Sequence, residues 1–217
     1  MTMRRAATLL FACGLIVSSV WTGTPAAATD ENFYVHKWPD GVFQSLPYAT
    51  GNVSYFNGAG EALSLVQFGP NTIHAMPDNG MVMWYAGSDW SSYPGNPCSK
   101  INVWYYEHPL GTSELARTYR CPPPPSTGPI TGASVLLNST PLNFAWHVQS
   151  GGYIWETWRF DFASVVLHET VHTGGWSGHW CCGPEAPWAT MSESMTGGVM
   201  WQRSLELHET NNIKQAY

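Results

Sequence analysis

The segment from His168 to His179 constrains this chain more than any other part of its sequence. It begins with His-Glu-x-x-His, in which His168 and His172 are four residues apart. On an α-helix such residues lie one turn apart and about 40° apart around the axis, so both imidazoles can face one metal ion. Glu169 is the next residue around the helix, and its carboxylate can reach a water molecule in the same cleft. The pattern predicts a helix that carries one side of a metal site.

The Gly174-Gly175 pair predicts where this helix ends, because glycine readily adopts the left-handed conformation that closes a helix and turns the chain. His179, seven residues after His172, is then available as a third ligand from the returning chain. Three nitrogen ligands and one open position for water are the arrangement of a catalytic zinc site. The expected metal ligands are therefore His168, His172 and His179, and Glu169 is the expected general base.

The residues before the histidines predict the start of the same helix. Asp161 can cap its N-terminus, because the carboxylate accepts backbone N–H groups and its charge suits the helix dipole. Val165 and Val166 would be buried on one side of the helix, while the two histidines face the cleft.

A partial copy of this segment near the C-terminus serves as an internal comparison. Residues 207–210 repeat the four residues of 167–170, but Asn212 stands where a second histidine would be needed. We therefore expect only the start of a helix there. The terminal helix is expected over 209–217, with Ile213 on one face together with the last residue.

The N-terminus has the features of a secretory signal peptide over residues 1–28. Arg4 and Arg5 form a short positive region, the run 6–20 is apolar, and three consecutive alanines form a cleavage site. The apolar run is too short to span a membrane, and no later stretch approaches about 20 apolar residues. We expect a secreted, extracellular protein that consists of one domain, residues 29–217.

Charge and composition exclude some kinds of partner. Without Arg4 and Arg5, seven basic residues remain against 15 acidic ones, which gives a net charge of −8, and Lys and Arg form no cluster. Nucleic acid and anionic membranes are therefore poor partners on electrostatic grounds. Only 11% of all residues are charged, while 12 are Trp and 10 are Tyr, which suits an extracellular protein with an uncharged polar and aromatic surface. We expect a monomer.

Four cysteines remain after signal-peptide cleavage, and an even number in an exported chain indicates two disulfides. Three pairings of Cys98, Cys121, Cys181 and Cys182 are possible. A bond between the adjacent Cys181 and Cys182 would require a strained ring, so we favour a pairing in which each of them bonds a different partner.

The remaining sequence alternates extended segments with turns rich in proline and glycine. Residues 29–57 look extended, and strands are expected at 101–106, 130–138 and 144–148 because of their β-branched and aromatic residues. Residues 61–68 suit either a short helix or a strand.

An amphipathic helix is expected after Asp78, which is a plausible N-cap. Met81, Trp84, Tyr85 and Ser88 follow it at roughly helical spacing. This helix would end between residues 87 and 90.

The motif around the histidines resembles that of the metzincin metalloproteases, most closely the small matrixin-like enzymes exported by bacteria. The family pattern is His-Glu-x-x-His-x-x-Gly-x-x-His followed by a Met-turn. His168, Glu169, His172 and Gly175 fall in register with it, and His179 falls one residue late.

The resemblance extends over residues 130–217. Thr-Met-Ser at 190–192 looks like the Met-turn, although the usual nearby tyrosine is missing, and 209–217 looks like the C-terminal helix. Residues 135–138 look like the edge strand that pairs with substrate. The resemblance implies an α+β, zincin-like single domain: a small, twisted, mostly parallel sheet with an active-site helix and a C-terminal helix.

The function implied is that of a secreted zinc endopeptidase. One catalytic zinc ion would activate water, Glu169 would take the proton, and a protein or peptide substrate would lie extended along the 135–138 edge. No Asp-rich calcium loop is visible, so a calcium requirement is not indicated either way.

Three other interpretations of the same residues stay open. In the first, Glu193 rather than His179 is the third ligand. In the second, the protein is a secreted zinc-containing binding module for a glycan or a cell-surface protein, with weak or no catalysis. In the third, the histidine cluster only stabilises a small exported domain.

Overall fold

The computed structural model describes residues 38–39, 46–51, 62–76, 81–111, 114–123, 128–140, 145–148, 154, 159–176, 189–191, 197–198 and 200–217. The strands in this part of the chain are β1 (Leu46–Thr50), β2 (Met83–Ser88), β3 (Asn102–His108), β4 (Ala116–Cys121), β5 (Gly132–Asn138), β6 (Ala145–His147) and β7 (Arg159–Asp161). The helices are α2 (Ala62–His74), α3 (Phe162–Thr173) and α4 (Leu207–Ala216), with a 3₁₀ turn at Trp201–Arg203.

Five strands form a mostly parallel sheet in the order β2-β1-β3-β5-β4. The first four strands in this order, β2, β1, β3 and β5, run parallel to one another. The last strand, β4, runs antiparallel to β5. β6 and β7 form a separate parallel pair. The protein is therefore a mixed α+β structure, as the sequence predicted.

The expectation that residues 135–138 form an edge strand is wrong. They belong to β5, which pairs with β3 on one side and with β4 on the other. All seven residues of β5 are buried, as is typical of an internal strand covered on both faces. The edge on this side of the sheet is β4, for which the sequence analysis predicted no strand.

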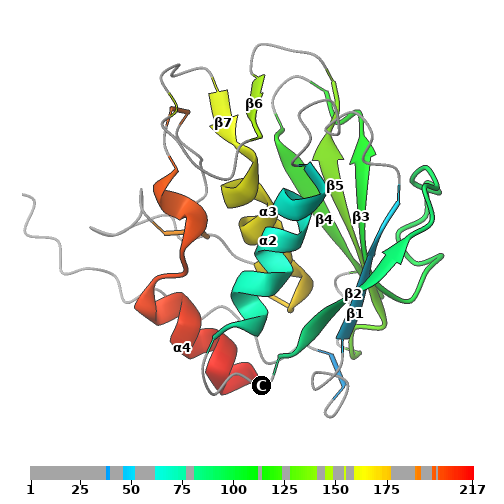
Figure 1. Ribbon diagram of the computed structural model, residues 1–217. Helices are drawn as coiled ribbons and strands as arrows, with labels where there is room; N and C mark the ends of the chain where they lie inside the picture. The colour runs from blue at the N-terminus through cyan, green and yellow to red at the C-terminus, as the bar shows by residue number, and fades with distance from the viewer. Residues whose placement is uncertain are drawn as a thin grey trace, which may run out of the picture.

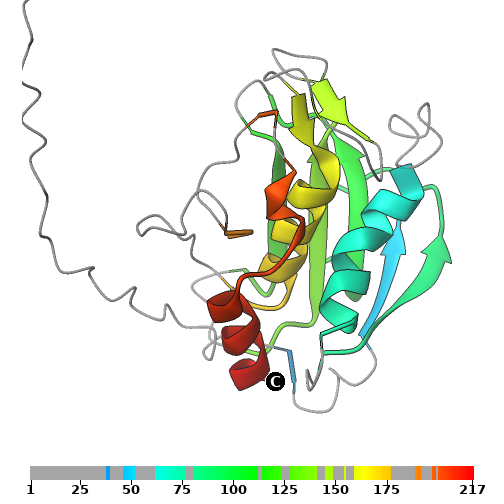
Figure 2. The ribbon, with the colours of Figure 1, turned by 60° about the vertical axis from the view of Figure 1, so that its left-hand side comes forward.

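Both α2 and α3 lie on one face of the sheet, and Figures 1 and 2 show them side by side against the strands. The core lies between these layers and includes Tyr48, Val103, Tyr105, Val135 and Leu167. A methyl group at Gly69 would lie 2.9 Å from the carbonyl oxygen of Val166, so α2 and α3 approach each other closely at this position. This packing fixes α3 relative to the sheet.

Several predicted elements are confirmed. The structure has strands within or close to 101–106, 130–138 and 144–148, and a terminal helix. Residues 62–68 belong to helix α2, which continues to His74 and contains Pro70.

The helix expected after Asp78 is wrong, because this segment forms β2. Within β2, Met83 and Tyr85 pack toward the core, whereas Trp84 and Ala86 are exposed on the other face. This alternation has the period of two that a strand requires. The same residues also fit a helical spacing, and it is pairing with β1 that makes this segment a strand.

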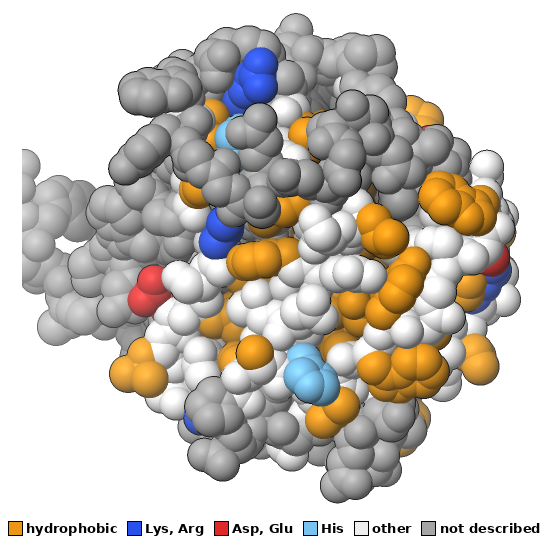
Figure 3. Space-filling view, in the orientation of Figure 1, with side chains coloured by type: hydrophobic (Ala, Val, Ile, Leu, Met, Phe, Trp, Pro, Cys, Tyr) orange, Lys and Arg blue, Asp and Glu red, His pale blue; other side chains and the backbone are white. Residues whose placement is uncertain are grey.

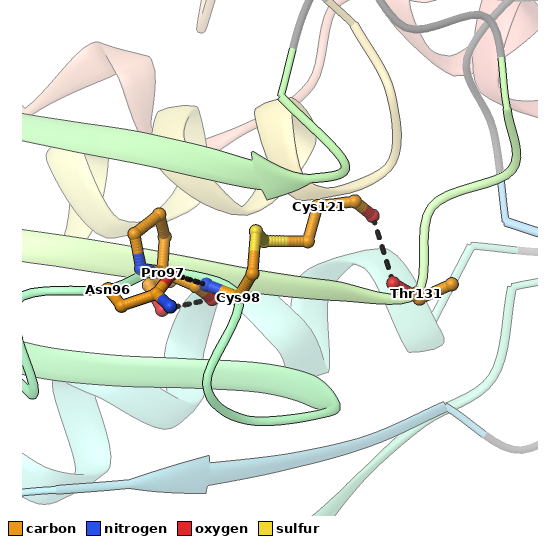
Figure 4. The surroundings of a disulfide bond; sticks show 6 residues. Asn96, Pro97, Cys98, Cys121 and Thr131 are labelled. Atoms are coloured by element: carbon orange, nitrogen blue, oxygen red, sulfur yellow. Dashed lines mark hydrogen bonds between the residues drawn. A yellow bond between two sulfur atoms is a disulfide. The ribbon is translucent and has the colours of Figure 1, made fainter.

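A disulfide joins Cys98, in the loop before β3, to Cys121 at the end of β4 (Figure 4). The backbone N–H of Cys98 is bonded to Asn96 Oδ1 at 2.9 Å, and the carbonyl of Cys121 accepts a hydrogen bond from Thr131. The expectation that Cys181 and Cys182 each bond one of these two cysteines is therefore wrong. Both of these residues lie outside the part of the chain that the structure describes.

The described surface carries few charges. Where Figure 3 colours this face by side-chain type, hydrophobic and uncharged polar groups far outnumber charged ones. Within the described residues, no helix is both long enough and apolar enough to cross a membrane. The segment expected to be a signal peptide, residues 1–28, lies outside the described part of the chain.

Candidate functional site

Helix α3 begins as the sequence predicted. The carboxylate of Asp161 accepts the backbone N–H of Ser164 at 2.9 Å and its hydroxyl at 2.6 Å. Arg203, which follows residues 189–191 in sequence, donates to both oxygens of the same carboxylate, at 2.6 and 2.8 Å. The Asp161 side chain is 1% exposed, so this ion pair links the start of α3 to the C-terminal region inside the protein.

Three donors from distant parts of the chain satisfy the carbonyl groups at the other end of α3. Trp38 Nε1 donates to Thr173 O at 2.8 Å, the Tyr217 hydroxyl donates to Gly174 O, and Arg120 donates to Gly175 O at 2.6 Å. The last carbonyls of a helix lack partners within the helix, so these bonds hold its end in place. Gly175 has a φ of +110°, whereas Gly174 is still helical, so the left-handed turn falls on the second glycine.

The rings of His168 and His172 converge. His168 Nδ1 is bonded to the carbonyl of Thr190, and His172 Nδ1 to the carbonyl of Trp176, each at 2.7 Å. A carbonyl only accepts hydrogen bonds, so each Nδ1 carries the proton and each neutral ring presents a lone pair at Nε2.

The two Nε2 atoms lie 3.1 Å apart. Burial lowers the pKa of His168, which favours its neutral ring. Two nitrogens bonded at about 2.0–2.1 Å to one tetrahedral zinc ion would lie about 3.3 Å apart. The donor set and its spacing therefore fit a cation held jointly by both rings.

The side chain of Glu169 on α3 contacts the edge strand, β4. Its carboxylate accepts a hydrogen bond from the Thr118 hydroxyl of β4 at 2.6 Å, and only 6% of Glu169 is exposed. Thr118 Oγ1 also lies 3.1 Å from the backbone carbonyl of Glu169. The edge strand thus fixes the orientation of the Glu169 carboxylate.

The Thr190–Met191 turn lies against His168, and the C-terminal segment holds it in place. Thr190 donates to Ser204 O at 2.8 Å, and the N–H of Met191 donates to Glu209 Oε1 at 2.6 Å. Met191 is fully buried. Burial also raises the pKa of Glu209 to about 7, although the carboxylate accepts backbone hydrogen bonds. The position of the turn determines where Thr190 O meets His168.

The structure brings together three of the four residues that the sequence predicted, namely His168, Glu169 and His172. The fourth, His179, lies outside the described residues, as does the alternative ligand Glu193. Among the residues that are described, no group of three or more His, Cys, Asp and Glu side chains could hold a metal ion.

The sequence analysis missed Thr118 and Arg203, and it assigned Glu209 only to the start of a helix. The capping box that Glu209 forms with Glu206 was a readable signal for the helix start, but not for the contact with Met191.

Comparison with known proteins leaves the family open. No protein-family model matches the chain, and no curated protein matched it.

Proposed function

We propose that this protein is a secreted zinc-dependent endopeptidase of the metzincin type. His168 and His172 would hold the zinc ion, with His179 as the third ligand. The observation that carries the proposal is the 3.1 Å separation of the two Nε2 atoms, each on a ring whose Nδ1 is hydrogen-bonded to a backbone carbonyl. Such bonds fix the tautomer and direction of a metal-binding histidine.

A bound zinc ion would supply Lewis-acid chemistry, which acidifies water and polarises a peptide carbonyl. Glu169 would act as the general base, holding the proton taken from water and then giving it to the leaving amine. The hydrogen bond from Thr118 supports this role because it holds the carboxylate in one orientation, against the edge strand.

The substrate would bind along β4 rather than along residues 135–138. Among the described strands, β4 pairs with β5 alone, so its outer edge can accept an extended peptide by strand addition. Thr118 belongs to this strand and contacts Glu169, so a peptide there would lie beside the general base.

Metal analysis and peptide cleavage test the proposal together. The purified secreted protein should contain about one zinc ion per chain and should cleave a fluorogenic peptide library, with activity lost on chelation and restored by zinc. Glu169→Ala should retain zinc but lose at least about 100-fold in turnover.

The partial copy on α4 offers a matched control. His168→Ala should abolish zinc binding, whereas His208→Ala, in the same Leu-His-Glu-Thr context, should leave it unchanged. A protein that holds zinc but cleaves no peptide in the library would instead be the zinc-containing binding module. Zinc that persists after His168→Ala would exclude this site altogether.

A further inference from the structure

The face of the five-stranded sheet opposite α2 and α3, here called the outer face, carries a pocket of about 200 Å³. Pro47 and Ala49 of β1 form its floor, together with Ala86 of β2. Trp104 of β3 forms one wall. The floor is built from small side chains, so the pocket is open between the two strands that flank β1.

A second tryptophan lies beside the pocket. Trp84 is paired with Pro47 across β2 and β1, and paired residues of neighbouring strands project to the same face. Trp104 is paired with Ala49 in the same way. β2 and β3 are two strand spacings apart, about 10 Å, so the two tryptophans flank β1. The Trp104 ring has the Lys100 ammonium 3.8 Å from its centre and is stacked against Tyr106, so the indole that a ligand would contact is that of Trp84.

The large exposed hydrophobic side chains of the described residues belong mostly to the segments that line this pocket. Four are found in the described part of the chain, and three of them are close to the pocket-lining residues in sequence: Trp84 at 47%, Trp90 at 60% and Ile101 at 72% exposure. The fourth, Leu207, is on α4. Exposed aromatic groups around a concavity indicate a binding site rather than a chance surface.

Backbone strain is found at the same place. Trp90 and Asn102 have φ values of +56° and +70°, and they are the non-glycine residues with positive φ among those described. Strained residues of this kind cluster at binding sites. Asn102 lines the pocket, and its side-chain amide has no hydrogen-bond partner within the described residues. An amide held in this way is available to a ligand.

The charges at the pocket are compensated. Asp89 forms an ion pair with Lys100, whose ammonium group also lies 3.8 Å from the centre of the Trp104 ring. Ser91 donates a further hydrogen bond to the same carboxylate. With both charges paired, the pocket presents small apolar side chains and the Asn102 amide, but no net charge for an ionic ligand.

We propose that this pocket binds one pyranose ring of a neutral glycan. A pyranose has an apolar C–H face, which suits contact with indole, and hydroxyl groups around its edge. One of those hydroxyl groups would bond to the Asn102 amide, which lines the same pocket. The site is on the sheet face opposite α3, so it is separate from the histidine pair and does not depend on the proposed peptidase activity.

Glycan-array screening of the secreted protein, followed by calorimetric titration with neutral hexasaccharides of β-1,4-linked glucose and N-acetylglucosamine, tests the proposal. A neutral glycan should bind, and Trp84→Ala should weaken its binding about tenfold. Asn102→Gly should weaken it similarly, because glycine keeps the left-handed backbone and removes only the amide. Leu207→Ala, a change at an exposed hydrophobic residue on α4, should have no effect.

Two results would overturn the proposal. One is that no neutral glycan on the array or in the titrations binds with a dissociation constant below about 1 mM. The other is that Trp84→Ala and Asn102→Gly both bind as the wild type does, which would place the glycan elsewhere. A third result would overturn it as well: a peptide that displaces the glycan and binds this pocket more tightly than any sugar would make it a peptide site.

Discussion

The carboxylate of Glu209 on α4 accepts the backbone N–H of Met191 at 2.6 Å. The last helix of the chain thus holds the Thr190–Met191 turn, in which the carbonyl of Thr190 is bonded to His168. The other carboxylate oxygen of Glu209 accepts the N–H of Glu206 at the start of α4. One buried side chain thus couples the C-terminal helix to the histidine pair.

The raised pKa of Glu209 predicts a loss of stability as pH rises. The pKa of Glu209 is about 7 in the folded protein, against an ordinary value of 4.5 that applies to the unfolded chain. The folded protein therefore binds this proton more tightly than the unfolded chain does. The contribution is largest below pH 4.5 and is lost as pH rises through 7, by about 3 kcal/mol in the free energy of unfolding.

Urea denaturation at pH 5 and pH 8 measures this effect when wild type is compared with Glu209→Gln. The variant is uncharged at both pH values, so its stability relative to the wild type should improve toward pH 8. Other titrating groups are common to both proteins and cancel in the comparison. An unchanged difference across this range would show that Glu209 titrates normally.

The Thr118 hydroxyl is predicted to support turnover rather than stability. Thr118→Val keeps the shape of the side chain but removes the hydrogen bond to Glu169, so kcat should fall about tenfold while KM changes little. Thr118→Ser should restore most of the loss, because serine keeps the hydroxyl. Steady-state kinetics on one peptide substrate gives both values, and equal rates for all three proteins would contradict the prediction.

The buried ion pair between Arg203 and Asp161 is predicted to be critical for folding. Arg203→Met leaves the 1%-exposed Asp161 carboxylate without its guanidinium partner, although the cap to Ser164 remains. We expect a loss of about 3–5 kcal/mol in the free energy of unfolding. Arg117→Met, which breaks an exposed pair with Glu114, should cost less than about 1 kcal/mol. Similar losses in both variants would refute the distinction.

Zinc should raise the melting temperature through the histidine pair. A ligand that binds the folded state at 100 times its dissociation constant adds about 2.7 kcal/mol to stability, which corresponds to a shift of several degrees. His172→Ala should remove this shift, whereas His74→Ala, an exposed histidine at the end of α2, should retain it. Differential scanning calorimetry with and without added zinc measures the shift, and an equal zinc effect in the two variants would contradict the proposed site.

The features that depend on neighbouring residues were predictable. The spacing of His168 and His172, the Asp161 cap and the glycine turn lie within 15 residues of one another. The geometry of one helix determines them, so the pattern was sufficient to place the helix and its two converging rings.

β2 shows where local pattern was insufficient. Its residues satisfy both a helical and a strand period, and pairing with β1, about 37 residues earlier in the chain, decided between them. The same limit applies to the edge strand. Nothing within residues 135–138 indicates that β4 pairs with them and so forms the edge of the sheet in their place.

The sequence by itself therefore determined the chemistry that α3 carries: two imidazoles and a carboxylate on adjacent turns, between a carboxylate cap and a glycine. Only the tertiary structure decided which groups orient them, namely Thr118 for Glu169 and Thr190 for His168. The physical reason is distance along the chain. A helix positions residues through hydrogen bonds four residues apart, whereas these contacts join residues 51 and 22 positions apart and form only when the sheet, α3 and the C-terminal segment pack together.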